Sequence, residues 1–225
     1  MIEALGLTKR RGGRALLDGV SLRVGAGEAV AVMGASGAGK TTLLRCLDGL
    51  ERADAGTVRV GGDAFSPDAP DYDGAVARVR RRLGLVFQEW HLFPHLTVLE
   101  NVALAPVHVA GRAPEAAARD AHALLERVGI GARAGARPRE LSGGEQQRAA
   151  IARALALAPE ALLMDEPTSA LDGERVESLV ALLRGLCAEG LALLVVTHDE
   201  PFARALAHRV IMLRDGALID HATRP

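Results

Sequence analysis

The chain has 225 residues and a formal net charge of −1; 49% of its residues are apolar and only 3% are aromatic. This length predicts one domain, with a core built mostly from leucine, valine and alanine. A near-neutral chain lacks the basic surplus of a general nucleic-acid binder, so we expect no nucleic-acid partner. Cys46 and Cys187 lie far apart without metal-ligand spacing, and we expect both to be reduced thiols.

Membrane-spanning segments are not expected. No run of the sequence reaches the roughly 18 apolar residues that a helix needs to cross a bilayer. The N-terminus opens with alternating residues rather than the basic patch and apolar run of a signal peptide. We therefore expect this chain to reach a membrane only through a membrane-protein partner.

The N-terminal third predicts a small β layer. Residues 2–8, 16–24 and 57–60 alternate apolar with polar or small residues, which is typical of half-exposed antiparallel strands. Between them, Ala29–Met33 is apolar throughout, as in a strand that is buried on both faces. Residues 66–82, rich in proline, aspartate and arginine, predict a loop followed by a basic helix.

Buried strands and helices alternate through the rest of the core. Further apolar runs predict strands at Leu83–Phe87, Ala161–Asp165 and Leu191–Thr197. Helices are predicted at Lys40–Leu50, Gly173–Glu189 and Glu200–Ala207. This alternation predicts an α/β fold with a mainly parallel sheet. Near the C-terminus, Asp215 and Gly216 predict a two-residue hairpin between strands at Val210–Leu213 and Ala217–Ile219.

Residues 91–158 form the least strand-like stretch. Pro114 suits a first helical turn, and the apolar residues after it have helical spacing. They are Ala116, Ala117, Ala121, Leu124, Leu125 and Val128. A further helix is predicted at Glu145–Leu157. We interpret residues 91–158 as a helical subdomain inserted into a core formed by about residues 1–90 and 159–225 of a single domain.

A glycine-rich loop follows the strand at Ala29–Met33 and fits the P-loop pattern of Gly, four residues, Gly, Lys and Ser or Thr. Its residues are Gly34, Ala35, Ser36, Gly37, Ala38, Gly39, Lys40 and Thr41, with Thr42 next. Glycines let backbone N–H groups converge on phosphate oxygens, and the helix that starts near Lys40 directs its positive end at the same anion. Lys40 adds a charge for the β and γ phosphates, and the Thr41 hydroxyl can bind Mg²⁺. The loop therefore predicts a nucleoside triphosphate site; a chance glycine-rich turn is the alternative.

Two acids end the strand at Ala161–Asp165. Asp165 at the strand end can reach a Mg²⁺ ion beside the P-loop, and Glu166 can polarise an attacking water. A general base of this kind contributes roughly 10²–10⁴-fold in rate. The alternative is a pair of acids at the start of a helix that opens near Pro167.

Leu141–Arg148, with the sequence LSGGEQQR, resembles the signature motif of ATP-binding cassette (ABC) ATPases. Ser142, Gly143 and Gly144 precede a predicted helix, so they would form a second anion-binding helix terminus. The resemblance covers nearly the whole chain and implies a P-loop NTPase core that binds ATP and Mg²⁺ and hydrolyses ATP. It further implies that the signature contacts the ATP of a second ABC subunit in a head-to-tail dimer, for which we expect a homodimer.

Other residues take roles from the same resemblance. Gln88 matches the Q-loop glutamine, a Mg²⁺ ligand that senses the water and links to the helical subdomain. Asp172, in Ser169–Asp172, matches the D-loop, which crosses the dimer interface. His198 matches the switch histidine at the γ-phosphate, although a lone histidine more often has a structural role. With Glu166 and Lys40, Gln88 and His198 are the expected catalytic residues.

One position departs from the family pattern. Its members usually stack an aromatic residue on adenine, just before a glycine upstream of the P-loop. Here Arg11 precedes Gly12 in that place. A guanidinium plane can also stack on a base. Two interpretations stay open: Arg11 stacks on adenine, or it is solvated.

The resemblance also implies a transport role. A transmembrane permease is expected to dock near Glu89–His95, which holds the only tryptophan of the chain; a hydrophobic cluster within the lobe is the alternative. The run Leu92–Val102 and the residues after the P-loop, Arg45–Leu47, are similar to ATPases of polar amino-acid importers. We therefore expect a solute-binding protein in the complex and a location at the cytoplasmic face of the cell membrane. Iron and polyamine importers share part of this run, but their ATPases typically carry a large C-terminal domain, for which Pro225 is expected to leave no room.

A second class of function stays open. Lipoprotein-releasing exporters have similarly short ATPases, and a cell-division module that pairs with a membrane protein is also compatible with this length. Cassettes that act in translation usually hold two copies in one chain, and those of DNA repair carry long coiled-coil insertions. Because 225 residues accommodate neither of these, we favour a transport ATPase.

Overall fold

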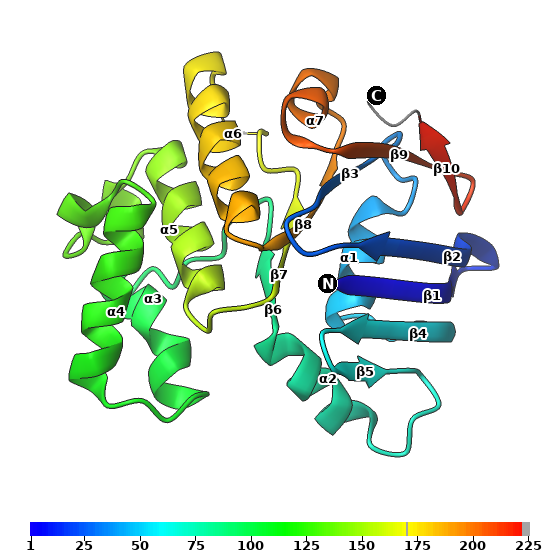
Figure 1. Ribbon diagram of the computed structural model, residues 1–225, viewed down its shortest axis with the longest axis horizontal. Coiled ribbons are helices and arrows are strands. Elements are labelled where there is room, and N and C mark those ends of the chain that lie inside the picture. The colour runs from blue at the N-terminus through cyan, green and yellow to red at the C-terminus, as the bar shows by residue number, and fades with distance from the viewer. Residues whose placement is uncertain (170, 222–225) are drawn as a thin grey trace.

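Two sheets pack on a common helix, α1 (Lys40–Asp48), in the computed structural model, which describes residues 1–169 and 171–221. The smaller sheet is antiparallel, with the order β2-β1-β4-β5. Its strands are β1 (Ile2–Arg11), β2 (Arg14–Val24), β4 (Ala55–Val60) and β5 (Asp63–Phe65). Figure 1 shows it to one side of the larger sheet, with α2 (Tyr72–Arg81) at its end. The predicted β layer and basic helix are therefore confirmed, and β5 is a strand that the sequence did not reveal.

The larger sheet has the order β10-β9-β3-β8-β7-β6. Its strands are β3 (Ala29–Met33), β6 (Leu83–Val86), β7 (Ala161–Asp165), β8 (Ala192–Thr197), β9 (Arg209–Arg214) and β10 (Ala217–His221). All neighbours are parallel except β9 and β10, which form the predicted hairpin. The fold is thus the mainly parallel α/β fold of a P-loop NTPase, as the alternation of apolar runs and helices predicts.

Each central strand supplies both hydrophobic cores. In β7, Ala161 and Leu163 face the core that α1 shares with the small sheet, whereas Leu162 and Met164 face the helices on the opposite side. All four are fully buried. Successive side chains of a strand point to opposite faces, so a strand that is covered on both sides has no position for a polar residue. This is why β7 is an unbroken apolar run until Asp165, which lies at the carboxyl end of the strand.

The remaining helices cover the second face and extend beyond it. They are α3 (Val98–His108), α4 (Pro114–Arg127), α5 (Gly143–Leu155), α6 (Gly173–Ala188) and α7 (Glu200–Leu206). The helices α3, α4 and α5 pack on one another beside the sheet (Figure 1). Short 3-10 turns at Gly131–Arg133 and Pro138–Glu140 lie between α4 and α5. The boundaries of a helical subdomain at residues 91–158 stay a prediction.

The start of α5 differs from the prediction. The helix begins at Gly143, two residues before the expected Glu145, because Ser142 caps it. The Ser142 hydroxyl accepts a hydrogen bond from the backbone N–H of Glu145, and the Glu145 carboxylate accepts one from the backbone N–H of Ser142. This reciprocal capping box satisfies two backbone donors that a helix otherwise leaves open.

Candidate functional site

The carboxyl ends of four neighbouring strands meet at one edge of the large sheet. The P-loop follows β3, His198 follows β8, Asp165 and Glu166 lie at the end of β7, and Gln88 comes just after β6. Because these strands are parallel neighbours, residues that are up to 164 positions apart in sequence converge there. Ligands of open α/β sheets bind at this edge.

The glycines of the P-loop lie close to the backbone of neighbouring segments. Gly39 precedes α1 with a φ of 103°, a conformation that favours glycine, and a Cβ there would lie 2.6 Å from the carbonyl oxygen of Leu16. At Gly34, a Cβ would lie 2.5 Å from the carbonyl oxygen of Leu213. No side chain caps the start of α1. The first backbone N–H groups of this helix are thus available to an anion.

Lys40 connects the P-loop to β7. Its Nζ lies 2.8 Å from the carbonyl oxygen of Gly34, 3.3 Å from that of Ala35 and 3.5 Å from Oε1 of Glu166. The residue is only 8% exposed. A buried ammonium needs oxygen partners, and these three supply them. The charge of Lys40 is therefore held at the loop itself, next to a carboxylate.

Glu166 has an unusual backbone that fixes its direction. Its φ is 44°, in the left-handed region that a residue with a Cβ rarely adopts, and its N–H donates to the carbonyl of Val196 at 2.9 Å. One carboxylate oxygen of Glu166 lies 2.9 Å from Nδ1 of His198 and accepts a hydrogen bond from the His198 backbone N–H at 3.1 Å. Strain of about 1–2 kcal/mol at such a residue is typical of functional sites. Glu166 thereby joins Lys40 and His198 in one contact network.

Asp165 and Thr41 are brought together as expected for a shared ion. Their Oδ1 and Oγ1 atoms are 3.3 Å apart. Burial raises the pKa of Asp165, the hydrogen bond from Thr41 opposes that rise, and the neighbouring Glu166 adds to it. A buried carboxylate next to a second carboxylate favours a nearby positive charge, which would compensate the burial of Asp165.

A cavity of about 300 Å³ lies over these residues. It is lined by Arg11, Leu16, Ser36, Gly37, Gly39, Lys40, Thr41, Thr42, Gln88 and Glu166. The structure thus brings most of the predicted phosphate-binding residues together with Gln88 and Glu166. Asp165 and His198 adjoin this set through Thr41 and Glu166.

Arg11 lines the cavity, and its guanidinium is paired with the carboxylate of Glu51. Its Nη2 donates to both carboxylate oxygens of Glu51, at 2.7 and 2.9 Å, while its side chain stays 61% exposed. Nζ of Lys9 lies 3.9 Å from the same carboxylate. Glu51 and Leu16 are residues of this site that the sequence did not reveal, because neither belongs to a motif. The contact with Glu51 leaves both interpretations of Arg11 open.

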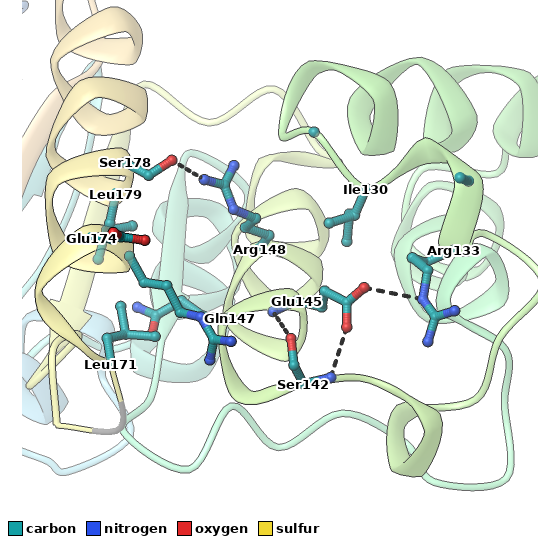
Figure 2. Close-up of a pocket in the computed structure, with 14 residues that line it drawn as sticks. Ile130, Arg133, Ser142, Glu145, Gln147, Arg148, Leu171, Glu174, Ser178 and Leu179 are labelled. Atoms are coloured by element: carbon teal, nitrogen blue, oxygen red, sulfur yellow. Dashed lines mark hydrogen bonds and ion pairs between the residues drawn. The ribbon is translucent and has the colours of Figure 1, made fainter.

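The signature residues lie elsewhere. Ser142 and Gly144 line a different cavity, of about 690 Å³, between α5 and α6 (Figure 2). Glu145 accepts from the Ser142 N–H at 2.7 Å, which lowers the pKa of that carboxyl, and Nε of Arg133 lies 3.1 Å from its other oxygen. Gly143 is the first residue of α5. Within the described residues, the structure therefore does not bring the signature to the P-loop of the same chain.

Asp172 is the N-cap of α6. Its Oδ1 accepts from the Arg175 N–H at 3.1 Å, and its Oδ2 lies 3.4 Å from Nε of Arg175. The neighbouring Leu171 lines the cavity between α5 and α6 (Figure 2). Ala170, within the predicted D-loop, lies outside the described residues. Asp172 is thus on the side of the signature rather than in the cavity of the P-loop.

Comparison with known proteins gives the family. The family model described as "ABC transporter" matches residues 17–169, and the chain belongs to this family. The dimeric structure of a bacterial ABC transporter cassette is similar over 100% of both chains, with a TM-score of 0.87 and 37% identity. A post-hydrolysis state of an ATP-binding cassette, bound to ADP and Pi, has a TM-score of 0.87 and 35% identity over the same coverage. The fold is accordingly that of an ABC ATPase, an enzyme that binds and hydrolyses ATP.

Curated relatives are similarly long. The octopine permease ATP-binding protein P of Rhizobium meliloti is 46% identical over 97% of this chain and 86% of its own length. The glutamine transport ATP-binding protein GlnQ of Bacillus subtilis is 43% identical, over 99% and 90%. The L-cystine transport system ATP-binding protein TcyN of Escherichia coli is 44% identical, over 97% and 88%.

In the described part of the chain, no helix combines the length and apolarity needed to cross a bilayer.

Proposed function

We propose that this chain is the ATP-hydrolysing subunit of an importer for a polar amino acid or a similar solute, and that it works through a separate membrane permease. The observation that carries this proposal is the cavity in which Lys40, Gln88 and Glu166 surround the N-terminus of α1. The names of the octopine, glutamine and cystine relatives support the solute class. Substrate choice belongs to other subunits, so the solute is an inference from relatives.

Within the cavity, each side chain has a distinct task. Lys40 leaves its carbonyl partners for the β and γ phosphates, which lie on the N–H groups of Gly34–Thr42. Glu166 accepts a proton from the attacking water, and His198 holds the Glu166 carboxylate and contacts the γ-phosphate. Gln88, two residues after the end of β6, lines the same cavity and would complete the contacts to the water.

The donor set fits Mg²⁺. Thr41 and Asp165 supply a hydroxyl and a carboxylate 3.3 Å apart, and Gln88 supplies an amide oxygen in the same cavity. The side chains of residues 1–169 and 171–219 contain no cluster of three or more histidine, cysteine or acidic groups that could hold a metal. Mg²⁺ commonly binds one or two carboxylates together with substrate phosphates and water, so this sparse set suits it. When bound, the ion would neutralise charge on the phosphates.

Two copies of the chain would complete each site. Ser142–Gly144 form an anion-binding helix terminus that lies away from the P-loop of its own chain, and a similar cassette forms a dimer. We propose a head-to-tail homodimer in which these residues contact the ATP that is bound by the partner's P-loop. Asp172 lies on the same side and would cross that interface.

The membrane partner would dock on the segment Glu89–His95. Phe93 in this segment is 42% exposed, and exposed aromatics commonly anchor interfaces. A permease there would place the chain at the cytoplasmic face of the membrane, with a solute-binding protein as a further component. An ATPase of a lipoprotein-releasing or cell-division complex is the alternative.

Co-purification from native membranes tests the transport assignment. We expect a tagged chain to retain a permease with several membrane spans and a solute-binding protein, and to release phosphate from ATP only when Mg²⁺ is present. Recovery of a lipoprotein-releasing or cell-division membrane protein instead would overturn the importer assignment. Phosphate release that persists after chelation of Mg²⁺ would overturn the proposed metal site.

A further inference from the structure

The segment Glu89–His95 is held in an unfavourable backbone conformation. Trp90 and His91 have φ values of 55° and 46°, which are left-handed and rare for side chains of this size. Such a conformation is unfavourable for a residue that carries a Cβ. Two such residues in sequence persist only where neighbouring groups fix the backbone.

Arg153 supplies that fixation. Its Nη2 donates to the carbonyl of Trp90 at 2.6 Å, and its Nη1 donates to the carbonyl of His91 at 2.5 Å. The guanidinium carbon lies 6.0 Å from the ring centroid of Phe93. Arg153 is half-buried, and this burial lowers the pKa of its guanidinium. The planar fork of arginine can bind two adjacent carbonyls at once, which a lysine ammonium matches poorly.

A second side chain fixes the other end of the segment. Asn101 of α3 is fully buried; its Nδ2 donates to the carbonyls of Phe93 and Thr97, at 3.1 and 2.9 Å, and its Oδ1 accepts from the Phe93 N–H at 2.7 Å. Asn101 therefore sets the position of Phe93 relative to α3. Within the described residues, Arg153 supplies the hydrogen bonds from α5 to the strained residues Trp90 and His91, and Trp90 also packs against the hydrophobic core that α5 shares.

The helix α5 has a different partner at each end. Ser142 caps its N-terminus, and Arg153 lies in its last turn. At 1.5 Å per residue, these two positions are roughly 16 Å apart along the axis, a length over which a helix is stiff. A displacement at the Ser142 end is thus transferred along α5 to the carbonyls that Arg153 binds.

We propose that Arg153 is a positioning residue that makes Glu89–His95 move with α5. Binding of a nucleotide at the Ser142 end of α5 then changes the position of Trp90. This inference rests on the proposed dimer, in which Ser142 meets the partner's ATP. Gln88 is the residue just before the segment and lines the cavity of the P-loop, so the segment also adjoins the ATP that its own chain binds. Arg153 touches neither nucleotide.

Fluorescence of Trp90 tests the proposal, because it is the only tryptophan of the chain. The parent protein carries Glu166→Gln, which we expect to retain ATP and the dimer. We expect Mg-ATP to change the emission of Trp90 in this parent, and Arg153→Lys to lose most of that change while nucleotide affinity and dimer formation stay the same. Arg127→Lys is the matched control, since Arg127 is an arginine of α4 paired with Glu189; we expect it to keep the full change.

Hydrogen–deuterium exchange of the peptide 89–97 provides a second measurement, and Arg153→Gln a second variant, should Arg153→Lys fold poorly. A full emission change, or unaltered ATP-dependent protection, in the Arg153 variants would overturn the proposal. A parent that dimerises with ATP without any change at Trp90 would also overturn it, while leaving the proposed function intact. A parent that neither binds ATP nor dimerises would overturn both.

Discussion

The helices that follow the P-loop and the signature motif begin in opposite ways. The helix α1 starts after a left-handed glycine without a side-chain cap, and its last turn holds a buried acid, Asp48, as well as the basic residue Arg45. The helix α5 starts with a complete capping box and has Arg153 in its last turn. Capping groups stabilise a helix by themselves, whereas an open N-terminus and a buried acid near the C-terminus do not.

This difference indicates how the N-termini of α1 and α5 would each bind phosphate. The N-terminus of α1 leaves its donors open for an anion, and Lys40 adds a positive charge there. At the N-terminus of α5, the carboxylate of Glu145 already accepts from the Ser142 N–H. We therefore expect α1 to bind ATP first and α5 to contact only a phosphate that a partner has already bound.

The largest expected effect concerns the α1 side of the comparison. Glu166→Gln should reduce steady-state phosphate release by roughly 10²–10⁴-fold, the contribution of a general base, while ATP binding is retained. Glu177→Gln, on the exposed face of α6, is the control and should hydrolyse ATP normally. Wild-type turnover in Glu166→Gln would remove Glu166 from the catalytic residues.

Asp48 tests the unfavourable end of α1. Burial raises its pKa to about 6 from its usual 3.8, and Arg80, with Nε 3.4 Å from Oδ2, opposes the rise only in part. The folded state thus binds the Asp48 proton more tightly than the unfolded chain does. The stability that this protonation contributes is full below about pH 4 and is lost as the pH rises through about 6. We expect Asp48→Asn to gain roughly 3 kcal/mol in free energy of unfolding relative to wild type between about pH 4 and pH 7. Chemical denaturation at both values measures it; parallel pH curves for the two proteins would contradict it.

A substitution at Ser142 tests the capping box at the start of α5. Ser142→Ala removes the hydroxyl of the capping box and should lower the free energy of unfolding by about 1 kcal/mol. ATP affinity of the monomer should not change, because Ser142 does not line the cavity of its own P-loop. Urea denaturation and titration with a fluorescent ATP analogue measure the two quantities. A large loss of monomer affinity would mean that the signature contacts the chain's own nucleotide.

Arg11 has the smallest expected effect. If it stacks on the base, Arg11→Ala should weaken ATP binding by about 0.5–1 kcal/mol, as for an exposed cation–π contact, and leave tripolyphosphate binding unchanged. Glu51→Gln should have a smaller effect in the same direction, since Glu51 only orients Arg11. Equal ATP affinity in Arg11→Ala and wild type would favour the solvated interpretation.

Much of this comparison could be predicted from the sequence. The strand at Ala29–Met33 is followed by a motif whose residues are adjacent, so both the fold around α1 and its phosphate loop follow from local order. The start of α5 was predicted two residues late, although Ser142 and Glu145 have the spacing of a capping box.

Contacts between distant segments could not be predicted. Glu51 is 40 positions from Arg11, and Arg153 is 62 and 63 positions from His91 and Trp90. None of these pairs has a sequence pattern, because an arginine can reach any carboxylate or carbonyl that the fold brings near. The left-handed backbone at Trp90, His91 and Glu166 is likewise imposed by the surrounding structure.

The central claim is that each active site combines the P-loop of one chain with the signature of another. Mixing two inactive variants, Lys40→Ala and Gly144→Asp, tests it most directly, since the added carboxylate repels phosphate at the start of α5. In a mixed dimer one site combines both defects and the other has an intact P-loop and an intact signature. With random pairing, intact sites amount to about a quarter of the wild-type number. We predict that the mixture releases phosphate well above either variant alone; a mixture as inactive as its components would contradict the shared site.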